Sequence, residues 1–249
     1  MRKLQELKSK FPSLVFGRYL FAEGRIIILD QEIPQEIQSK LSFLKTRDGK
    51  ETLLMKTQEI AADLDALLKQ GLSEIINIRD TLFVFPGNGA KKVRELSKIH
   101  IGYLQTEVFA KRFWKPGNEP IVTVGTITPP VGTPKRKIKT IIVLDDVISS
   151  GQTFFKLYEK NFDRFKTSCT WFGGCWFAQV PRMERTISGI TGYQKIITAI
   201  VVEGPQGKRV PLNSLSTLVL ESEIAKSYAQ RHFQDPVEFL EIIQKLSRR

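Results

Sequence analysis

Histidine, cysteine and methionine are scarce in this chain of 249 residues, which holds only two, two and three of them. Cys169 and Cys175 lie within SCTWFGGCWF, at a spacing that matches no usual zinc signature, so we expect two buried free thiols and no structural metal site. With His100 and His232 as the only histidines, no Ser-His-Asp set is apparent, and we interpret both as surface or packing residues.

Long hydrophobic runs are also missing. The longest stretch without a charged residue, 121–134, contains three prolines, two glycines and four threonines, which excludes a membrane-spanning helix there. The first eleven residues, MRKLQELKSKF, lack the apolar core of a signal peptide. We therefore expect a cytoplasmic protein with no membrane partner, and a composition of 41% hydrophobic and 26% charged residues predicts a folded chain with a substantial core.

Acidic residues are too few to balance the basic ones, and the formal net charge is +12. Residues 81–139 alone hold eleven Lys or Arg and three Glu, which leaves a local excess of eight positive charges. An excess of this size favours a polyanion as partner. A small phosphate compound and a nucleic acid both fit this pattern.

The first part of the chain has the pattern of short β-hairpins. Residues 14–21 and 25–30 flank Glu23-Gly24, and 41–46 and 50–56 flank Asp48-Gly49, a dipeptide suited to a tight turn. A helix is predicted over 57–70, with Gly71 as its end.

From residue 73 onward, strand and helix patterns alternate. The expected strands are 80–86, 102–110, 120–128, 139–145, 170–178 and 195–204, and the expected helices are 90–98 and 151–162. Apolar runs without strict alternation indicate strands covered on both faces, which is typical of a mainly parallel α/β sheet. Two helices follow, the second capped by Asp235 with Phe239, Ile242, Ile243 and Leu246 inward. We predict an N-terminal hairpin segment with a helix (1–72), an α/β core (73–205) and a helical tail (206–249).

The stretch TIIVLDDVISSGQT at 140–153 carries the clearest chemical signal. Asp145 and Asp146 follow a buried strand, and ligands of open parallel sheets bind at the carboxyl ends of strands. The small residues that follow turn into a helix, where backbone amides and hydroxyls converge on a phosphate; they are Ser149, Ser150, Gly151, Gln152 and Thr153. Carboxylates beside a phosphate cradle suit a ligand that carries a phosphate and a vicinal diol, whose hydroxyls donate to them.

This motif resembles the ribose-phosphate-binding signature of type I phosphoribosyltransferases, and the resemblance extends over about 79–205. It implies a mainly parallel sheet of that kind, binding of 5-phosphoribosyl 1-pyrophosphate (PRPP), and Mg²⁺ as cofactor. Asp145 and Asp146 would hold the ribose hydroxyls and contact the metal indirectly, and 149–153 would hold the 5-phosphate. The resemblance also implies a homodimer.

The same resemblance implies two pyrophosphate-binding segments. One follows the first core strand, at Gly87, Asn88 and Gly89, with Lys91 or Lys92 as further charge or as a solvated helix face. The other is a mobile loop between the second and third core strands, for which the candidates are Lys111, Arg112 and Lys115. We interpret the basic run at 135–139 as solvated.

The acceptor stays open. In relatives that use 6-oxopurines, an aspartate and a lysine stand where this chain has Ser149 and Gln152, so that pattern is disfavoured. The hood that recognises a nucleobase-like acceptor would come from the N-terminal hairpins, the tail, or both. The alternatives are a PRPP-sensing regulator that binds nucleic acid and an effector of the same fold in a host–virus conflict system.

Overall fold

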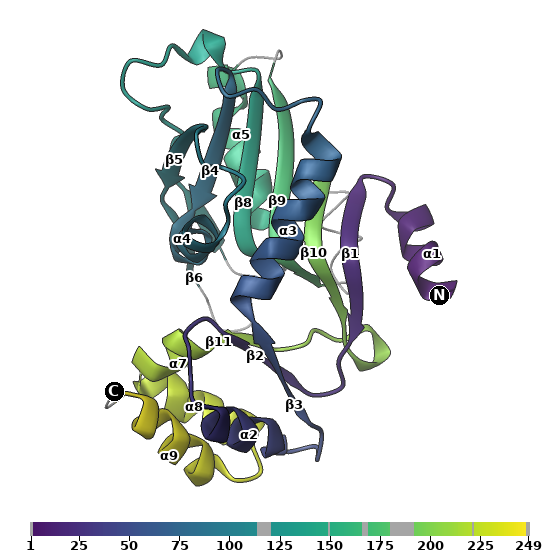
Figure 1. Cartoon of the computed structure of the whole chain (residues 1–249), viewed down its shortest axis with the longest axis vertical. Coiled ribbons are helices and arrows are strands. Elements are labelled where there is room, and N and C mark those ends of the chain that lie inside the picture. Colours follow the sequence, from purple (N-terminus) through teal and green to yellow (C-terminus); the bar gives the residue numbers. More distant parts are fainter. Residues whose placement is uncertain are drawn as a thin grey trace. The chain divides into compact units, whose positions relative to one another are not determined.

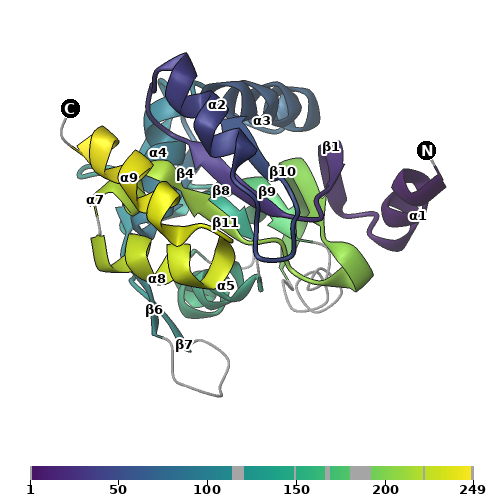
Figure 2. The ribbon, with the colours of Figure 1, turned by 90° about the horizontal axis from the view of Figure 1, so that it is seen from below.

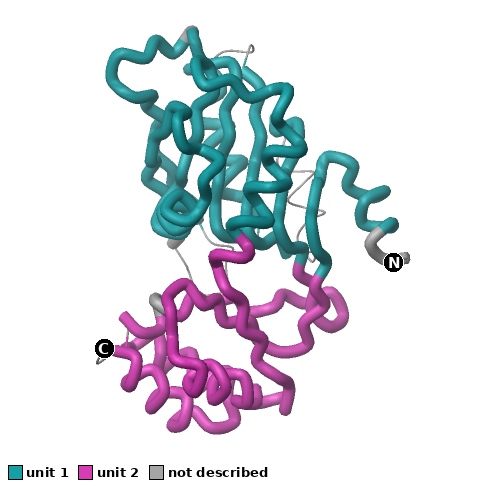
Figure 3. Tube along the Cα trace, viewed as in Figure 1, with its two compact units in different colours: residues 1–19, 61–201 teal, residues 20–60, 202–249 magenta. Residues whose placement is uncertain are grey.

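The computed structural model describes residues 2–113, 121–148, 150–165, 169–179, 192–220 and 222–247. The chain forms two compact units (Figure 3): unit 1 holds residues 1–19 and 61–201, and unit 2 holds residues 20–60 and 202–249. Unit 2 therefore joins part of the predicted segment 1–72 with the predicted tail 206–249.

Unit 1 is built on a six-stranded sheet with the order β1-β10-β9-β8-β4-β5 (Figure 1). Its strands are β1 (Leu14–Phe21), β4 (Thr81–Pro86), β5 (Leu104–Val108), β8 (Thr140–Ile148), β9 (Thr170–Gln179) and β10 (Tyr193–Glu203). The pairs β4–β5, β4–β8 and β8–β9 are parallel. The predicted mainly parallel α/β fold is thus confirmed. The helices around this sheet are α1 (Arg2–Lys10), α3 (Thr57–Leu72), α4 (Gly87–Leu96) and α5 (Gln152–Phe165), with a short 3-10 turn at Lys135–Lys137.

Helices lie on both faces of the sheet because the central strands are apolar on both faces. Every residue of β4 is buried. On β9, a side chain at Gly173 would collide with Phe154 of α5, and one at Gly174 would contact Leu68 of α3. Since successive residues of a strand point to opposite faces, α3 and α5 cover opposite faces of β9.

One predicted strand does not join this sheet. Residues of β7 (Ile121–Val124) pair antiparallel with β6 (Ala110–Phe113) in a separate two-stranded ribbon. The expectation that 120–128 forms a core strand is therefore wrong in its placement, because the exposed residues of β7 alternate with buried ones. Such a strand has one solvated face, which suits a ribbon better than a sheet covered on both sides.

Unit 2 contains a parallel three-stranded sheet with the order β11-β2-β3. Its strands are β2 (Arg25–Leu29), β3 (Thr52–Lys56) and β11 (Leu212–Ser214), and its helices are α2 (Gln35–Phe43), α7 (Leu215–Leu220), α8 (Ser222–His232) and α9 (Pro236–Ser247), with a 3-10 turn at Pro205–Gly207. In Figures 1 and 2, α7, α8 and α9 lie together. The helices enclose an apolar core in which the Phe233 and Phe239 rings stack at 4.6 Å, and the predicted inward face of α9 is confirmed.

The predicted N-terminal hairpins are wrong. β1 and β2 belong to different sheets, and β2 pairs parallel with β3. The turn at Asp48-Gly49 exists, since Gly49 has φ +72° and Thr46 and Lys50 are hydrogen-bonded, but residues 41–43 end helix α2 instead of forming a strand. Ile37 and Leu41, spaced four apart, bury one face of this helix, and that tertiary contact overrides the strand-like pattern.

Both cysteines are free thiols, as predicted, but the expectation that both are buried is correct only for Cys175. Cys175 is fully buried in β9, and burial raises the pKa of its thiol to about 12, so it stays protonated. Cys169 is half-buried, and burial raises the pKa of its thiol as well. Neither thiol has the depressed pKa of a nucleophile.

Candidate functional site

The two aspartates lie near the carboxyl end of β8, the strand between β4 and β9. From β4 the chain passes through α4 to β5 on one side, and it then returns to β8 on the other side of β4. The strand order therefore reverses between β4 and β8. A crevice at such a reversal is where open α/β sheets bind their ligands.

Within β8 the two carboxylates do not form a side-by-side pair. Successive side chains of a strand alternate between faces, so Asp145 and Asp146 point to opposite sides of the sheet. Asp145 is almost fully buried, and its Oδ1 accepts a hydrogen bond of 2.9 Å from the Asp146 amide. Asp146 is half-buried, and its Oδ1 accepts one of 2.8 Å from the Val147 amide. Alternation thus lowers the repulsion that adjacent like charges would otherwise cause.

Asp146 lies against the first turn of α4. A Cβ atom at Gly89 would collide with the Asp146 carboxylate, so only glycine leaves room for this approach. The predicted pyrophosphate segment and the predicted ribose-binding acid, 57 residues apart in the sequence, are therefore neighbours. This contact is the main geometric feature that sequence reasoning did not predict.

The turn from β4 into α4 depends on glycine and leaves the helix start without a side-chain cap. Gly87 has φ +71°, and a Cβ there would lie 3.0 Å from the Ala110 carbonyl oxygen, so the turn out of β4 requires glycine. No acidic residue stands in the first turn of α4, and Pro86 provides no side-chain cap. The first amides of the helix and its dipole then favour an anion.

A cavity of about 460 Å³ adjoins this turn and is lined by Gly87, Asn88, Lys91 and Lys111 together with Phe85, Glu107, Val108, Phe109 and Ala110. The structure thus brings together residues from both predicted pyrophosphate segments, since Gly87 and Asn88 lie in α4 and Lys111 in β6. Arg112 also lies in β6, whereas Lys115 lies outside the described residues. The predicted loop position of Lys111 and Arg112 is wrong, because both belong to the β6–β7 ribbon.

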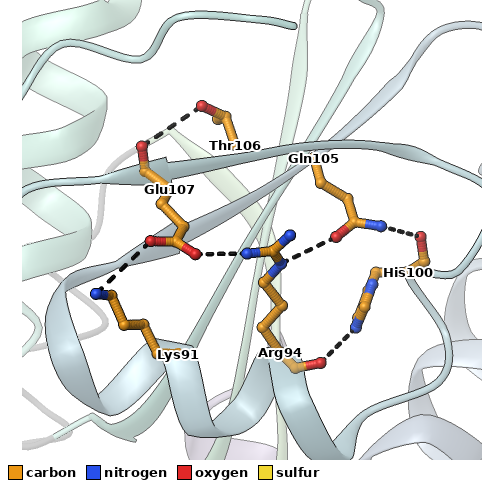
Figure 4. A network of polar contacts seen from close by, with 6 residues as sticks. All are labelled: Lys91, Arg94, His100, Gln105, Thr106 and Glu107. Atoms are coloured by element: carbon orange, nitrogen blue, oxygen red, sulfur yellow. Dashed lines mark hydrogen bonds and ion pairs between the residues drawn. The ribbon is translucent and has the colours of Figure 1, made fainter.

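Glu107 of β5 brings a negative charge to the lining of this cavity, and sequence reasoning missed it. Figure 4 shows its carboxylate between Arg94 and Lys91 of α4. Lys91 Nζ is 3.9 Å from Glu107 Oε2, and Arg94 also donates to Gln105 Oε1 at 3.1 Å. Glu107 is the one charged residue of strand 104–108, and this was the only feature of the sequence that could have pointed to its role.

His100 completes the network in Figure 4 as a packing residue. It is buried, its Nε2 lies 2.7 Å from the Arg94 carbonyl oxygen, and its ring contacts Phe85 edge to face. The predicted packing role is confirmed for this histidine.

The second predicted anion cradle begins α5. Gly151 has φ +68°, and the Phe155 amide donates to its carbonyl at 2.9 Å, so the chain turns directly into the helix at Gln152. Ser150 is half-buried and Thr153 is buried at 4% exposure. Ser149 lies outside the described residues. Both helix starts thus follow strands that end at the reversal of the sheet.

The donor set of the site suits a metal held mainly by a ligand. Among the described residues, no group of three His, Cys, Asp or Glu side chains could hold a metal ion. Asp145 and Asp146 point to opposite faces, so they cannot chelate one ion together. Oxygen ligands suit Mg²⁺, which is commonly bound through one or two carboxylates plus substrate phosphates.

No described helix is long and apolar enough to cross a membrane.

No family model matches the chain, and no curated protein matches it either. Solved structures that resemble it include adenine phosphoribosyltransferase of Trypanosoma brucei, with 9% identity and a TM-score of 0.40. The match covers 58% of this chain and 65% of that one. That structure contains AMP, pyrophosphate and ribose-5-phosphate.

Two further neighbours belong to the same class. The xanthine-guanine-hypoxanthine phosphoribosyltransferase of Helicobacter pylori has 13% identity and a TM-score of 0.45, over 67% of this chain and 94% of that one. The orotate phosphoribosyltransferase of Aeropyrum pernix has 12% identity and a TM-score of 0.40, over 67% and 92%. The neighbours are thus phosphoribosyltransferases, the class that the 140–153 motif resembles. At these identities and TM-scores, the function must be argued from the chain's own residues.

Proposed function

We propose that this protein binds PRPP and transfers its 5-phosphoribosyl group to a nitrogen acceptor, with release of pyrophosphate. The observation that supports this most is the contact between Asp146 and Gly89 at the reversal of the sheet. It joins an acid suited to sugar hydroxyls with a helix start suited to an anion. PRPP carries both groups at neighbouring positions on one ribose ring.

Each part of PRPP has a matching group in unit 1. The ribose hydroxyls donate to the carboxylate of Asp146, and Asp145 supports the strand end from the other face. The turn at 150–153 receives the 5-phosphate through backbone amides and the Thr153 hydroxyl. The cavity at the start of α4 receives pyrophosphate, whose charge Lys91 and Lys111 neutralise.

The reaction needs positioning and electrostatics instead of a protein nucleophile. The bond between the anomeric carbon and the pyrophosphate oxygen breaks, a bond from that carbon to the acceptor nitrogen forms, and the acceptor loses a proton. Positive charge builds on the ribose ring while negative charge builds on pyrophosphate, so carboxylates near the ring and cations near the leaving group lower the barrier. Bound Mg²⁺ would add a template and Lewis acid for the pyrophosphate oxygens.

The first prediction concerns the acidic pair, which we would change in the variant D145N/D146N. Asparagine keeps an oxygen that accepts from the following amide, so the two local hydrogen bonds and the fold persist. The variant removes the one charged hydrogen-bond partner that Asp146 offers to the ribose, which costs about 1.5–3 kcal/mol, so PRPP binding is expected to weaken at least about tenfold. Calorimetry with PRPP, with and without Mg²⁺, measures this.

The matched control is Asp163→Asn, an exposed acid on α5 that lies outside the site. It is expected to keep the wild-type affinity. Equal affinity of wild type and D145N/D146N, or no wild-type binding at any Mg²⁺ concentration, would contradict the proposal. Pyrophosphate release in the presence of candidate bases then separates a transferase from a regulator, because a PRPP sensor binds PRPP without releasing pyrophosphate.

A further inference from the structure

An acidic side chain lines the cavity proposed to receive pyrophosphate. Among the described residues of that lining, Glu107 is the one carboxylate, and Lys91 and Lys111 are the two cations. A carboxylate repels a phosphate group nearby and so opposes its binding. In the proposed reaction, the carboxylates near the ribose come from β8, so Glu107 of β5 is left without a part in it.

The register of the sheet fixes Glu107 beside the start of α4. β4 and β5 pair in parallel, with Phe85 opposite Glu107. Because paired residues of neighbouring strands point to the same face of a sheet, Glu107 lies on the face of Phe85, which also lines the cavity. Helix α4 begins at Gly87, directly after β4. The carboxylate therefore lies close to the helix start, where an anion is favoured.

Arg94 holds Glu107 more firmly than Lys91 does (Figure 4). Arg94 donates to Glu107 Oε1 and, at 3.1 Å, to Gln105 Oε1, so its guanidinium has two acceptors on β5. Lys91 Nζ lies 3.9 Å from Glu107 Oε2, and the two side chains are 54% and 43% exposed. Ion pairs this long and this exposed contribute little to stability. Lys91 can therefore exchange Glu107 for a phosphate oxygen at small cost.

Of the two cations that contact Glu107, Lys91 lines the cavity, whereas Arg94 is not part of its described lining. Arg94 keeps its contact with Gln105 when the charge at position 107 is removed. Glutamine at this position also keeps an oxygen that accepts from Arg94. The change Glu107→Gln therefore removes one negative charge from the cavity and leaves the arrangement of the neighbouring side chains in place.

We propose that Glu107 lowers the affinity of this cavity for pyrophosphate and so promotes release of that product. This inference rests on the proposed function, in which the cavity receives pyrophosphate. Without Glu107, two lysines and an uncapped helix start would face the anion with no opposing charge in the described lining. Removing a like charge a few ångströms from a multiply charged ligand, at a half-exposed site, is worth at least about fivefold in affinity.

The test is a calorimetric titration of inorganic pyrophosphate into the wild type and Glu107→Gln at the same Mg²⁺ concentration. The variant is expected to bind pyrophosphate at least about fivefold more tightly. This gain is expected to shrink as the ionic strength rises, because salt screens repulsion between half-exposed charges. It is also expected to be smaller for inorganic phosphate, which carries fewer charges. A general change of the fold would show neither dependence.

Two further variants show where the ligand binds and whether the effect is local. Lys91→Gln removes a cation of the lining and is expected to weaken pyrophosphate binding at least about tenfold, both alone and combined with Glu107→Gln. Glu95→Gln is the matched control, because Glu95 is an exposed acid of α4 outside the described lining. It is expected to keep the wild-type affinity at every ionic strength.

Weaker binding of pyrophosphate by Glu107→Gln would overturn the inference, because Glu107 would then serve to hold the cations in place. An affinity gain that does not depend on ionic strength would overturn it as well. If the wild type binds PRPP but Glu107→Gln leaves the pyrophosphate affinity unchanged, this inference fails while the proposed function stands. If the wild type binds neither PRPP nor pyrophosphate, both fail.

Discussion

At the scale of single residues, Gly89 allows α4 to approach Asp146, because glycine has no side chain to collide with the carboxylate. In Gly89→Ala the new Cβ meets the Asp146 carboxylate, so that side chain must rotate away. We expect a loss of unfolding free energy of about 1–2 kcal/mol and PRPP binding at least about tenfold weaker. Thermal unfolding and calorimetry measure the two effects.

The control for this variant is Glu95→Ala, an exposed position on the same helix. It is expected to leave PRPP affinity unchanged and to alter stability by less than about 0.5 kcal/mol. If Gly89→Ala bound PRPP as tightly as wild type, the contact between α4 and Asp146 would have no role in ligand binding.

His232 gives a pH prediction at the same scale. Burial and the nearby arginines lower its pKa in the folded state to about 4, against about 6.5 in the unfolded chain. The unfolded state therefore binds more protons between these values, and stability falls as the pH drops from 6.5 toward 4. After allowance for partial exposure, we expect a contribution of about 1–2 kcal/mol.

The measurement is the unfolding temperature of wild type and His232→Gln across pH 4–7. The decline toward acid pH is expected to be smaller in the variant, because glutamine has no proton to take up. Parallel curves for the two proteins would show that His232 is not the titrating group.

At the scale of elements, β8 is paired on both edges along only part of its length. Its first residues pair with both β4 and β9, whereas beyond Val143 only the pairing with β9 continues. The freed edge is where the carboxylates satisfy the amides of Asp146 and Val147. A strand that loses one neighbour in this way leaves space for a ligand while keeping its backbone hydrogen bonds.

The start of α9 allows a direct test of a sequence signal. Asp235 Oδ1 accepts from the Val237 and Glu238 amides at 3.0 and 2.9 Å. Asp235→Ala removes this N-cap and is expected to lower the unfolding free energy of unit 2 by about 1 kcal/mol. Denaturant unfolding measures the change, and Asp235→Asn, which keeps the accepting oxygen, is expected to recover most of it. No change in Asp235→Ala would show that the apolar face of α9 alone fixes the helix.

At the scale of the whole molecule, each compact unit is built from segments far apart in the sequence. β2 of unit 2 pairs with β11, which follows it by more than 180 residues, and the Ser214 hydroxyl donates to Asp30. Such pairings carry no local signal in the sequence, since register and partner are chosen by burial of the shared core. The predicted hairpins failed for this reason.

The sequence by itself determined the elements of the core and the motif at 140–153. Long apolar runs and a Gly-containing turn before a helix are local signals, so the buried strands β4, β8 and β9, the helix α5 and the place of the aspartates followed from them. Only the tertiary structure decided that the acids face opposite sides, that Gly89 meets Asp146 and that Glu107 faces Lys91. These features depend on packing between distant residues, where the contact that buries most apolar area prevails over any local preference.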